Sequence, residues 1–135
     1  MVTVKKFLFV AALTFSLMMS AQTEAASEEY LGEWEGGWKA YLIVNSMELL
    51  RNPPNAEVAC KVKAVSPRGT VKYINYDVNL TMESANKVLV DFTDSLGGRG
   101  RFYFGNPGVY QVEQELAKFI MAGLVYAMDY AKRQR

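Results

Sequence analysis

The chain has 135 residues, half of them hydrophobic, and its 15 basic and 14 acidic residues nearly balance. This length suits one domain with a modest core, and the balanced charge offers no field that would attract nucleic acid. The chain has no histidine and a single cysteine. Their scarcity removes the usual general base, the commonest zinc ligand and the Ser-His and Cys-His nucleophile pairs. We therefore expect no metal site, no cofactor and no catalytic residues.

Residues 1–25 have the three regions of a secretory signal peptide. Lys5 and Lys6 precede an apolar run over residues 7–19, and the small residues Thr23 and Ala25 are spaced for cleavage. The run is shorter than the roughly 20 residues of a membrane span, although an uncleaved anchor is the alternative. We expect a secreted or periplasmic protein whose mature part, residues 26–135, is a single domain. The leader carries two basic residues and one acidic residue, so the mature part has no net charge.

Residues 33–45 alternate between apolar even positions and mostly polar odd positions, which predicts a first β-strand. Gly36 and Gly37 in its middle indicate a bulge or a sharp bend. Residues 46–55 contain Pro53 and Pro54, so they predict a long connection. That connection is interpreted either as a flap over an opening or, preferably, as a short helical turn that caps the core.

The same alternation predicts strands over residues 56–66, 70–82, 87–94 and 99–104. Residues 109–114 are assigned to a sixth strand, with a helix that begins near Val109 as the alternative. From about residue 115 to residue 132, apolar residues recur at steps of three and four, which predicts an amphipathic helix. Cys60 lies on the apolar phase of its strand and is interpreted as a buried hydrophobe; a reactive thiol or an intermolecular disulfide is the alternative.

Short turns between successive strands predict a mainly β fold: a five- or six-stranded antiparallel meander curled into a small barrel and closed by the helix. The predicted core contains the inward residues of these elements: Trp34, Trp38, Leu42, Val58, Val62, Ile74, Val78, Leu80, Val90, Phe92, Phe102, Phe104, Leu116, Ile120 and Leu124. Whether side chains fill the interior or leave it hollow is open at this point.

The segment Leu31-Gly32-Glu33-Trp34 resembles the Gly-x-Trp opening of the calycin superfamily, which includes lipocalins and avidins. The start of this chain also resembles that of small secreted bacterial domains with a GxWxGxW-type opening. The resemblance implies that Trp34 is buried at the closed end of a barrel and that Arg99 or Arg101 lies across it. It also implies a C-terminal helix after the barrel and a ligand held inside.

The candidate ligand-binding residues are aromatic or basic: Trp34, Trp38, Tyr76, Arg99, Arg101 and Tyr103. The outward residues Tyr41, Tyr73 and Tyr103 can stack on a sugar or contact a protein, or they can form cross-strand pairs. The glycine-rich stretch over residues 96–101 can cradle an anion or be a plain hairpin loop with edge arginines. Glu33 and Glu35, about 7 Å apart along one strand face, are a pair that glycosidic acid/base catalysis could use, or else two solvated charges.

We expect a non-enzymatic binding or structural protein that carries a small apolar ligand or contacts a glycan or a protein. One alternative is an assembly or membrane-contact module, in which the helix makes a homo-oligomer or touches a lipid surface. The other is a carboxylate-based hydrolase that would use Glu33 and Glu35.

Overall fold

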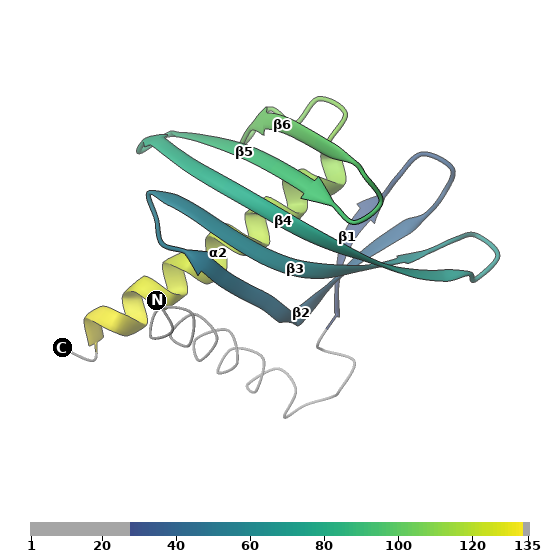
Figure 1. The fold of residues 1–135 in the computed structure, drawn as a ribbon, viewed down its shortest axis with the longest axis horizontal. Helices are drawn as coiled ribbons and strands as arrows, with labels where there is room; N and C mark the ends of the chain where they lie inside the picture. Colours follow the sequence, from purple (N-terminus) through teal and green to yellow (C-terminus); the bar gives the residue numbers. More distant parts are fainter. Residues whose placement is uncertain (1–27, 134–135) are drawn as a thin grey trace.

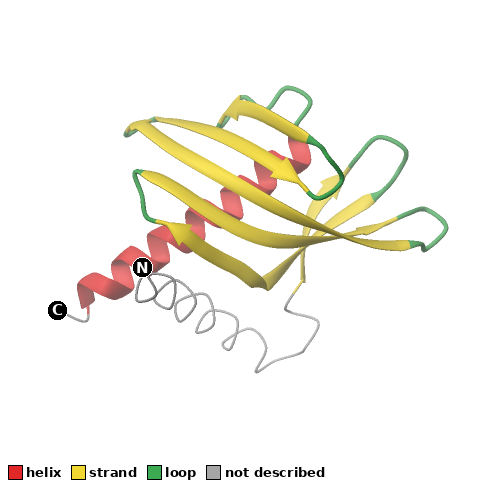
Figure 2. Ribbon diagram, in the orientation of Figure 1, coloured by secondary structure: helices red, strands yellow, loops and turns green. Residues whose placement is uncertain are grey.

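The computed structural model describes residues 28–133, with side chains described for residues 28–124. Six strands are followed by one helix (Figures 1 and 2): β1 (Glu28–Glu33), β2 (Lys39–Arg51), β3 (Asn55–Val65), β4 (Val71–Ser84), β5 (Lys87–Asp94), β6 (Arg99–Tyr103) and α2 (Gln111–Arg133). Each strand pairs antiparallel with the next one in the chain. The predicted mainly β meander with a C-terminal helix is confirmed. The predicted signal peptide lies outside the described residues.

The sheet curls into a half-barrel, and α2 runs across its concave side (Figure 1). The sheet does not close on itself, because β1 and β6 are its two edges. The helix instead supplies the missing wall. Its buried stripe faces the apolar side of the sheet, and the residues of that stripe are Val112, Leu116, Ile120 and Leu124. Each strand and the helix thus bury one apolar face in a single core.

Alternation along the strands and the apolar repeat of the helix predict most of the core correctly. The predicted core residues that are buried are Leu42, Val58, Val62, Ile74, Val78, Leu80, Val90, Phe92, Phe102, Leu116, Ile120 and Leu124. Cys60 is buried among them as a free thiol, as predicted. Trp34, Trp38 and Phe104 are only partly buried against this core. The half-barrel is open at one end, so the two tryptophans keep part of their surface accessible.

The single strand predicted over residues 33–45 is wrong. The chain turns back after Trp34, so residues 33–45 contain the end of β1, a turn and the first half of β2. Most of β1 lies before the predicted strand. Gly36 and Gly37 both have positive φ, which a turn can demand and which residues with a Cβ rarely adopt. Alternation does not reveal the turn. Trp34 and Trp38 project from the same face whether they belong to one strand or are paired across a hairpin.

The connection predicted over residues 46–55, whether a flap or a helical turn, is also wrong. β2 continues through it to Arg51, and Met47 and Leu49 are buried. A bulge between Ile43 and Glu48 moves the buried phase from even to odd positions. The Ser46 hydroxyl stabilises this bulge by donating to the Ile43 carbonyl at 2.6 Å and accepting from the Lys61 amide at 2.8 Å.

The sixth strand predicted over residues 109–114 is wrong as well, and the helical alternative is the correct one. The Tyr110 amide donates to the Pro107 carbonyl, and α2 begins at Gln111. Glu113 lies in the first turn, where a negative charge favours the positive end of a helix. The helix therefore starts four residues earlier than its apolar repeat predicts. The last strand, β6, corresponds to the strand predicted over residues 99–104.

Candidate ligand-binding site

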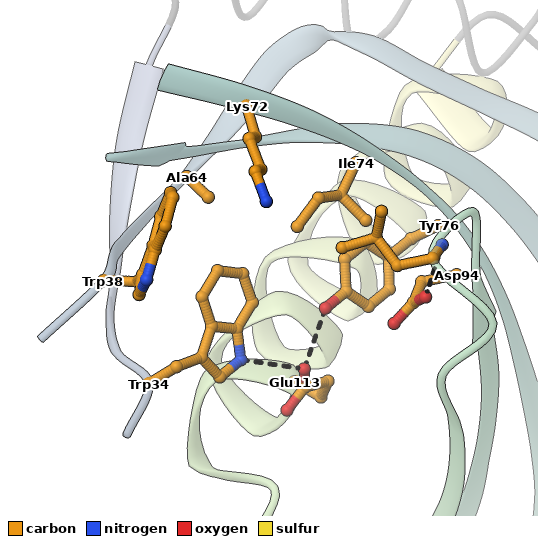
Figure 3. Close-up of a pocket in the computed structure, with 9 residues that line it drawn as sticks. Trp34, Trp38, Ala64, Lys72, Ile74, Tyr76, Asp94 and Glu113 are labelled. Atoms are coloured by element: carbon orange, nitrogen blue, oxygen red, sulfur yellow. Dashed lines mark hydrogen bonds between the residues drawn. The ribbon is translucent and has the colours of Figure 1, made fainter. Parts of the chain in front are cut away.

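A cavity of about 320 Å³ opens at one end of the half-barrel (Figure 3). The β1–β2 turn, β3, β4, the end of β5 with the loop after it, and the first turn of α2 contribute its lining residues. Its walls are mostly apolar or aromatic, and its lining residues are Trp34, Trp38, Ala64, Lys72, Ile74, Tyr76, Asp94, Leu96 and Glu113. Buried side chains thus fill most of the interior of the half-barrel, and the cavity lies at its open end.

The β1–β2 hairpin places both tryptophans at this cavity. The Trp34 amide donates to the Trp38 carbonyl at 2.9 Å, so the two residues face each other across the start of the hairpin. Side chains at such paired positions project from the same face of a sheet. The glycines between them form the turn, and Figure 3 shows the two indoles along one side of the open space.

Glu113 is the buried polar residue of the site. It projects from the first turn of α2, and only 7% of its surface is exposed. Its Oε2 atom accepts two hydrogen bonds, from Trp34 Nε1 at 3.2 Å and from the Tyr76 hydroxyl at 2.9 Å. These bonds join β1's turn, β4 and α2 at the cavity wall (Figure 3). One carboxylate oxygen thereby fixes the orientation of two aromatic rings.

Tyr76 is rigidly placed. Its ring packs on Phe92 with centroids 5.9 Å apart, and Phe92 packs in turn against Phe102 and Tyr110. Burial, and after it the neighbouring charge of Glu113, raises the pKa of the Tyr76 hydroxyl far above its ordinary value. The hydroxyl therefore stays protonated and serves as a hydrogen-bond donor to Glu113, not as a base.

Two further charges lie at the cavity. The Lys72 ammonium stands over the Trp38 ring, 5.2 Å from its centroid. The Asp94 carboxylate is committed to its own loop, because its Oδ1 atom accepts from the amides of Leu96 at 2.9 Å and Gly98 at 2.8 Å. Lys72 is thus held by a cation–π contact on an otherwise exposed side chain, whereas Asp94 is fixed.

Of the six predicted ligand-binding residues, Trp34, Trp38 and Tyr76 come together at the cavity. The structure places the other three on the outward phase of β6. Arg99 and Arg101 line a separate depression that also includes Asp91, and Arg101 Nε donates to Asp91 Oδ1 at 2.8 Å. Tyr103 lies beside Glu83 and under the Lys87 ammonium, 4.9 Å from its ring centroid. The second group therefore does not share a site with the first.

Sequence reasoning missed Glu113, Lys72 and Asp94. Glu113 fell within the segment assigned to a strand, where its parity placed it outward. The signal that could have found it is an acid three residues inside a helix that follows Pro107-Gly108. Lys72 and Asp94 sit at strand ends, where alternation says little about direction.

The remaining candidates are apart from the cavity. Glu33 ends β1 and Glu35 lies in the following turn, both exposed, so the shared strand face predicted for them is wrong. The outward tyrosines Tyr41 and Tyr73 lie under lysines, with Lys63 and Lys61 at 5.4 and 6.0 Å from their ring centroids. Within the described part of the chain, no three potential metal-ligating side chains gather.

The calycin resemblance implies an arginine across Trp34. The structure instead places Arg99 and Arg101 at the separate depression on β6. Trp34 is partly exposed and hydrogen-bonded to Glu113, and the cation beside a tryptophan is Lys72 at Trp38. Searches against known protein families, curated proteins and solved structures found no match to this chain. Over the described residues, no helix has the length and apolar character needed to cross a membrane.

Proposed function

We propose that the protein is a non-enzymatic, secreted or periplasmic binding protein that takes a small ring-containing molecule into the cavity beside Trp34 and Trp38. The observation that carries the proposal is the cavity itself, about 320 Å³ in volume and walled by two indoles, Ile74 and Tyr76. Ligand sites are typically mostly apolar hollows with a few fixed polar groups, and this volume is at the small end of their range. A molecule of one or two rings suits it.

The arrangement supports binding more than chemistry. Tyr76 holds its proton, Asp94 is occupied by loop amides, and the described residues bring no nucleophile–base pair to the cavity. The Gly-x-Trp start supports the same proposal, since a calycin-like protein would hold its ligand inside the curled sheet. A carboxylate-based hydrolase has less support, because Glu33 and Glu35 are exposed and separate from the cavity.

The described part of the helix does not favour an assembly role. The stripe that begins at Val112 and ends at Leu124 is used within the molecule, as part of the core. The first half of α2 is therefore a structural wall of the half-barrel.

Tryptophan fluorescence is the direct test, because the chain has only two tryptophans and both line the cavity. Titration with 2-phenylethanol, a neutral ring compound of suitable size, should change the emission in a saturable way. Unchanged emission and no heat of binding in calorimetry, with this and other single-ring compounds, would contradict the proposal.

A cavity-filling variant sharpens the test. Ala64 lies on the cavity wall, so Ala64→Leu should place its added carbons in the space a ligand needs and weaken 2-phenylethanol binding by about tenfold or more. Ala59→Leu is the matched control, because Ala59 lies on the opposite phase of the same strand. Thermal unfolding must show that both variants are folded. Equal affinity in folded Ala64→Leu and in the natural chain would place the ligand elsewhere.

A further inference from the structure

The carboxylate of Glu113 is only half satisfied. Both hydrogen bonds that described residues donate to it reach Oε2, which leaves Oε1 without a donor among the described residues. A carboxylate oxygen can accept two hydrogen bonds, and a buried one that accepts none costs free energy. Here the side chain is more than nine-tenths buried, and it lines the cavity (Figure 3). The carboxylate thus accepts two of the roughly four hydrogen bonds it can take, and an N–H donor that enters the cavity meets a buried negative charge there.

The charges around the cavity favour a cation. The ionisable groups that could be charged at neutral pH are Lys72, Asp94 and Glu113, which together carry one net negative charge. Asp94 already accepts hydrogen bonds from two loop amides, so the open acceptor is Glu113. An anion would meet this buried carboxylate without a compensating donor at that wall.

The indoles favour the same sign of charge. The face of a tryptophan attracts cations, and Lys72 already occupies such a position over Trp38. Lys72 is exposed, and among the described residues it is held at Trp38 only by this cation–π contact, so a cationic ligand can displace it into solvent. Trp34 is held in place by its own bond to Glu113, so a ring and a cation are both accommodated by one rigid wall.

From these observations we propose that the ligand is a small ring-bearing organic amine, bound in its protonated form with its ammonium group on Glu113 and its ring against the two indoles. This inference rests on the proposed binding function and specifies its ligand class. No covalent step is involved. Selectivity for an amine over a neutral analogue comes from the charge-assisted hydrogen bond to the buried carboxylate.

Three probes of nearly equal size test the inference: 2-phenylethylamine, 2-phenylethanol and phenylacetate, which are cationic, neutral and anionic at pH 7. Affinities measured by tryptophan fluorescence should fall in that order, with the amine about tenfold or more tighter than the alcohol. Binding of the alcohol alone tests the cavity, and the ratio between the probes tests the charge preference.

Glu113→Gln is the decisive variant, because it keeps the size of the side chain and an oxygen for Trp34 and Tyr76. It should abolish the preference for the amine, a loss of about tenfold, and change binding of the alcohol by less than about twofold. Glu115→Gln, one charge removed on the same helix but away from the cavity, should leave the order of the three probes unchanged.

Lys72→Met provides an independent readout that does not disturb the hydrogen bonds of Glu113. Removing the competing ammonium should tighten the amine and weaken phenylacetate, whereas Lys61→Met, which removes a similar contact with Tyr73 on the outer face, should do neither. If phenylacetate binds as well as the amine, or if Glu113→Gln leaves the amine unaffected while the alcohol still binds, the inference is overturned and the proposed function stands. If none of the three probes binds the folded protein, the proposed function fails first.

Discussion

Some single residues in this protein are constrained by contacts with residues that are distant in the sequence. Gly100 on β6 has an ordinary φ, yet a Cβ atom built there would lie 2.6 Å from Tyr110 Cζ and 2.8 Å from Phe92 Cε1. The ring of Tyr110 thus rests directly on the backbone of β6. This contact connects the edge strand to the segment that leads into α2.

Gly100→Ala should therefore destabilise the protein. The added methyl group overpacks a site between two rings, and we expect the free energy of unfolding to fall by about 1–3 kcal/mol. Urea unfolding followed by circular dichroism measures it. In a Tyr110→Ala background the same substitution should cost less, because one of the colliding rings is gone. Equal costs in both backgrounds would show that the Tyr110 ring is not the obstacle.

Burial also sets the behaviour of Cys60. Loss of hydration raises the pKa of its thiol to about 12, against an ordinary value of 9.0. Between these two pH values the unfolded chain loses the thiol proton while the folded chain keeps it. The unfolded state then binds fewer protons, so the free energy of unfolding falls as the pH rises. Tyr76, whose pKa is raised by burial, acts in the same direction above pH 10.

The expected result is a urea midpoint that drops between pH 9 and pH 11, with the thiol contributing at most about 1.4 kcal/mol per pH unit. Cys60→Ala should flatten part of this fall and leave the share due to Tyr76. Parallel curves for the two proteins over this range would refute a buried, protonated thiol.

At the scale of elements, sequence periodicity identified five of the strands and most of the helix, because each buries one face. Periodicity failed at the β1–β2 turn, where the alternating pattern continues through a change of element. It failed again at the bulge in β2, where an insertion exchanges the buried and exposed positions. The predicted strand over residues 33–45 runs through the β1–β2 turn and omits most of β1, because Trp34 and Trp38 fit one alternating pattern. β2 was ended too early because its bulge at Ser46 exchanges the parities. Alternation carries no information about either event.

The site shows the same division between what a pattern predicts and what it does not. Trp34, Trp38 and Tyr76 were predicted because aromatic residues on an apolar phase stand out. Glu113 was not, because its burial depends on donors that arrive from two other elements. Arg99 and Arg101 have side chains suited to an anion, but β6 directs them away from the cavity.

The helix itself offers a substitution that should stabilise the fold. Gly123 lies inside α2, and the nearest heavy atom to a Cβ built there is Met47 Cε at 4.0 Å. Glycine is a poor residue for a helix interior, so Gly123→Ala should raise the free energy of unfolding by about 0.5–1 kcal/mol. A higher urea midpoint with an unchanged slope is the expected observation. A lower midpoint would mean that the Met47 contact is tighter than the structure has it.

At the scale of the whole molecule, a half-barrel with a helix for its missing wall is a solution for a chain with too few strands to close. Composition and alternation predicted the fold class, because a meander with one apolar face must cover that face. They did not predict how far the sheet closes, which depends on twist, bulges and the length of each strand. The opening at one end is the consequence that matters for function, because it leaves the two indoles accessible.

The order of elements along the chain has a consequence for biosynthesis. Every strand pairs with its immediate successor, so the sheet can assemble hairpin by hairpin as the polypeptide emerges. Its concave side, however, stays uncovered until the stripe from Val112 to Leu124 has been translated. A chain interrupted before that stripe would expose the apolar concave side of the sheet. Such a chain would aggregate readily and would be bound by chaperones or degraded by proteases.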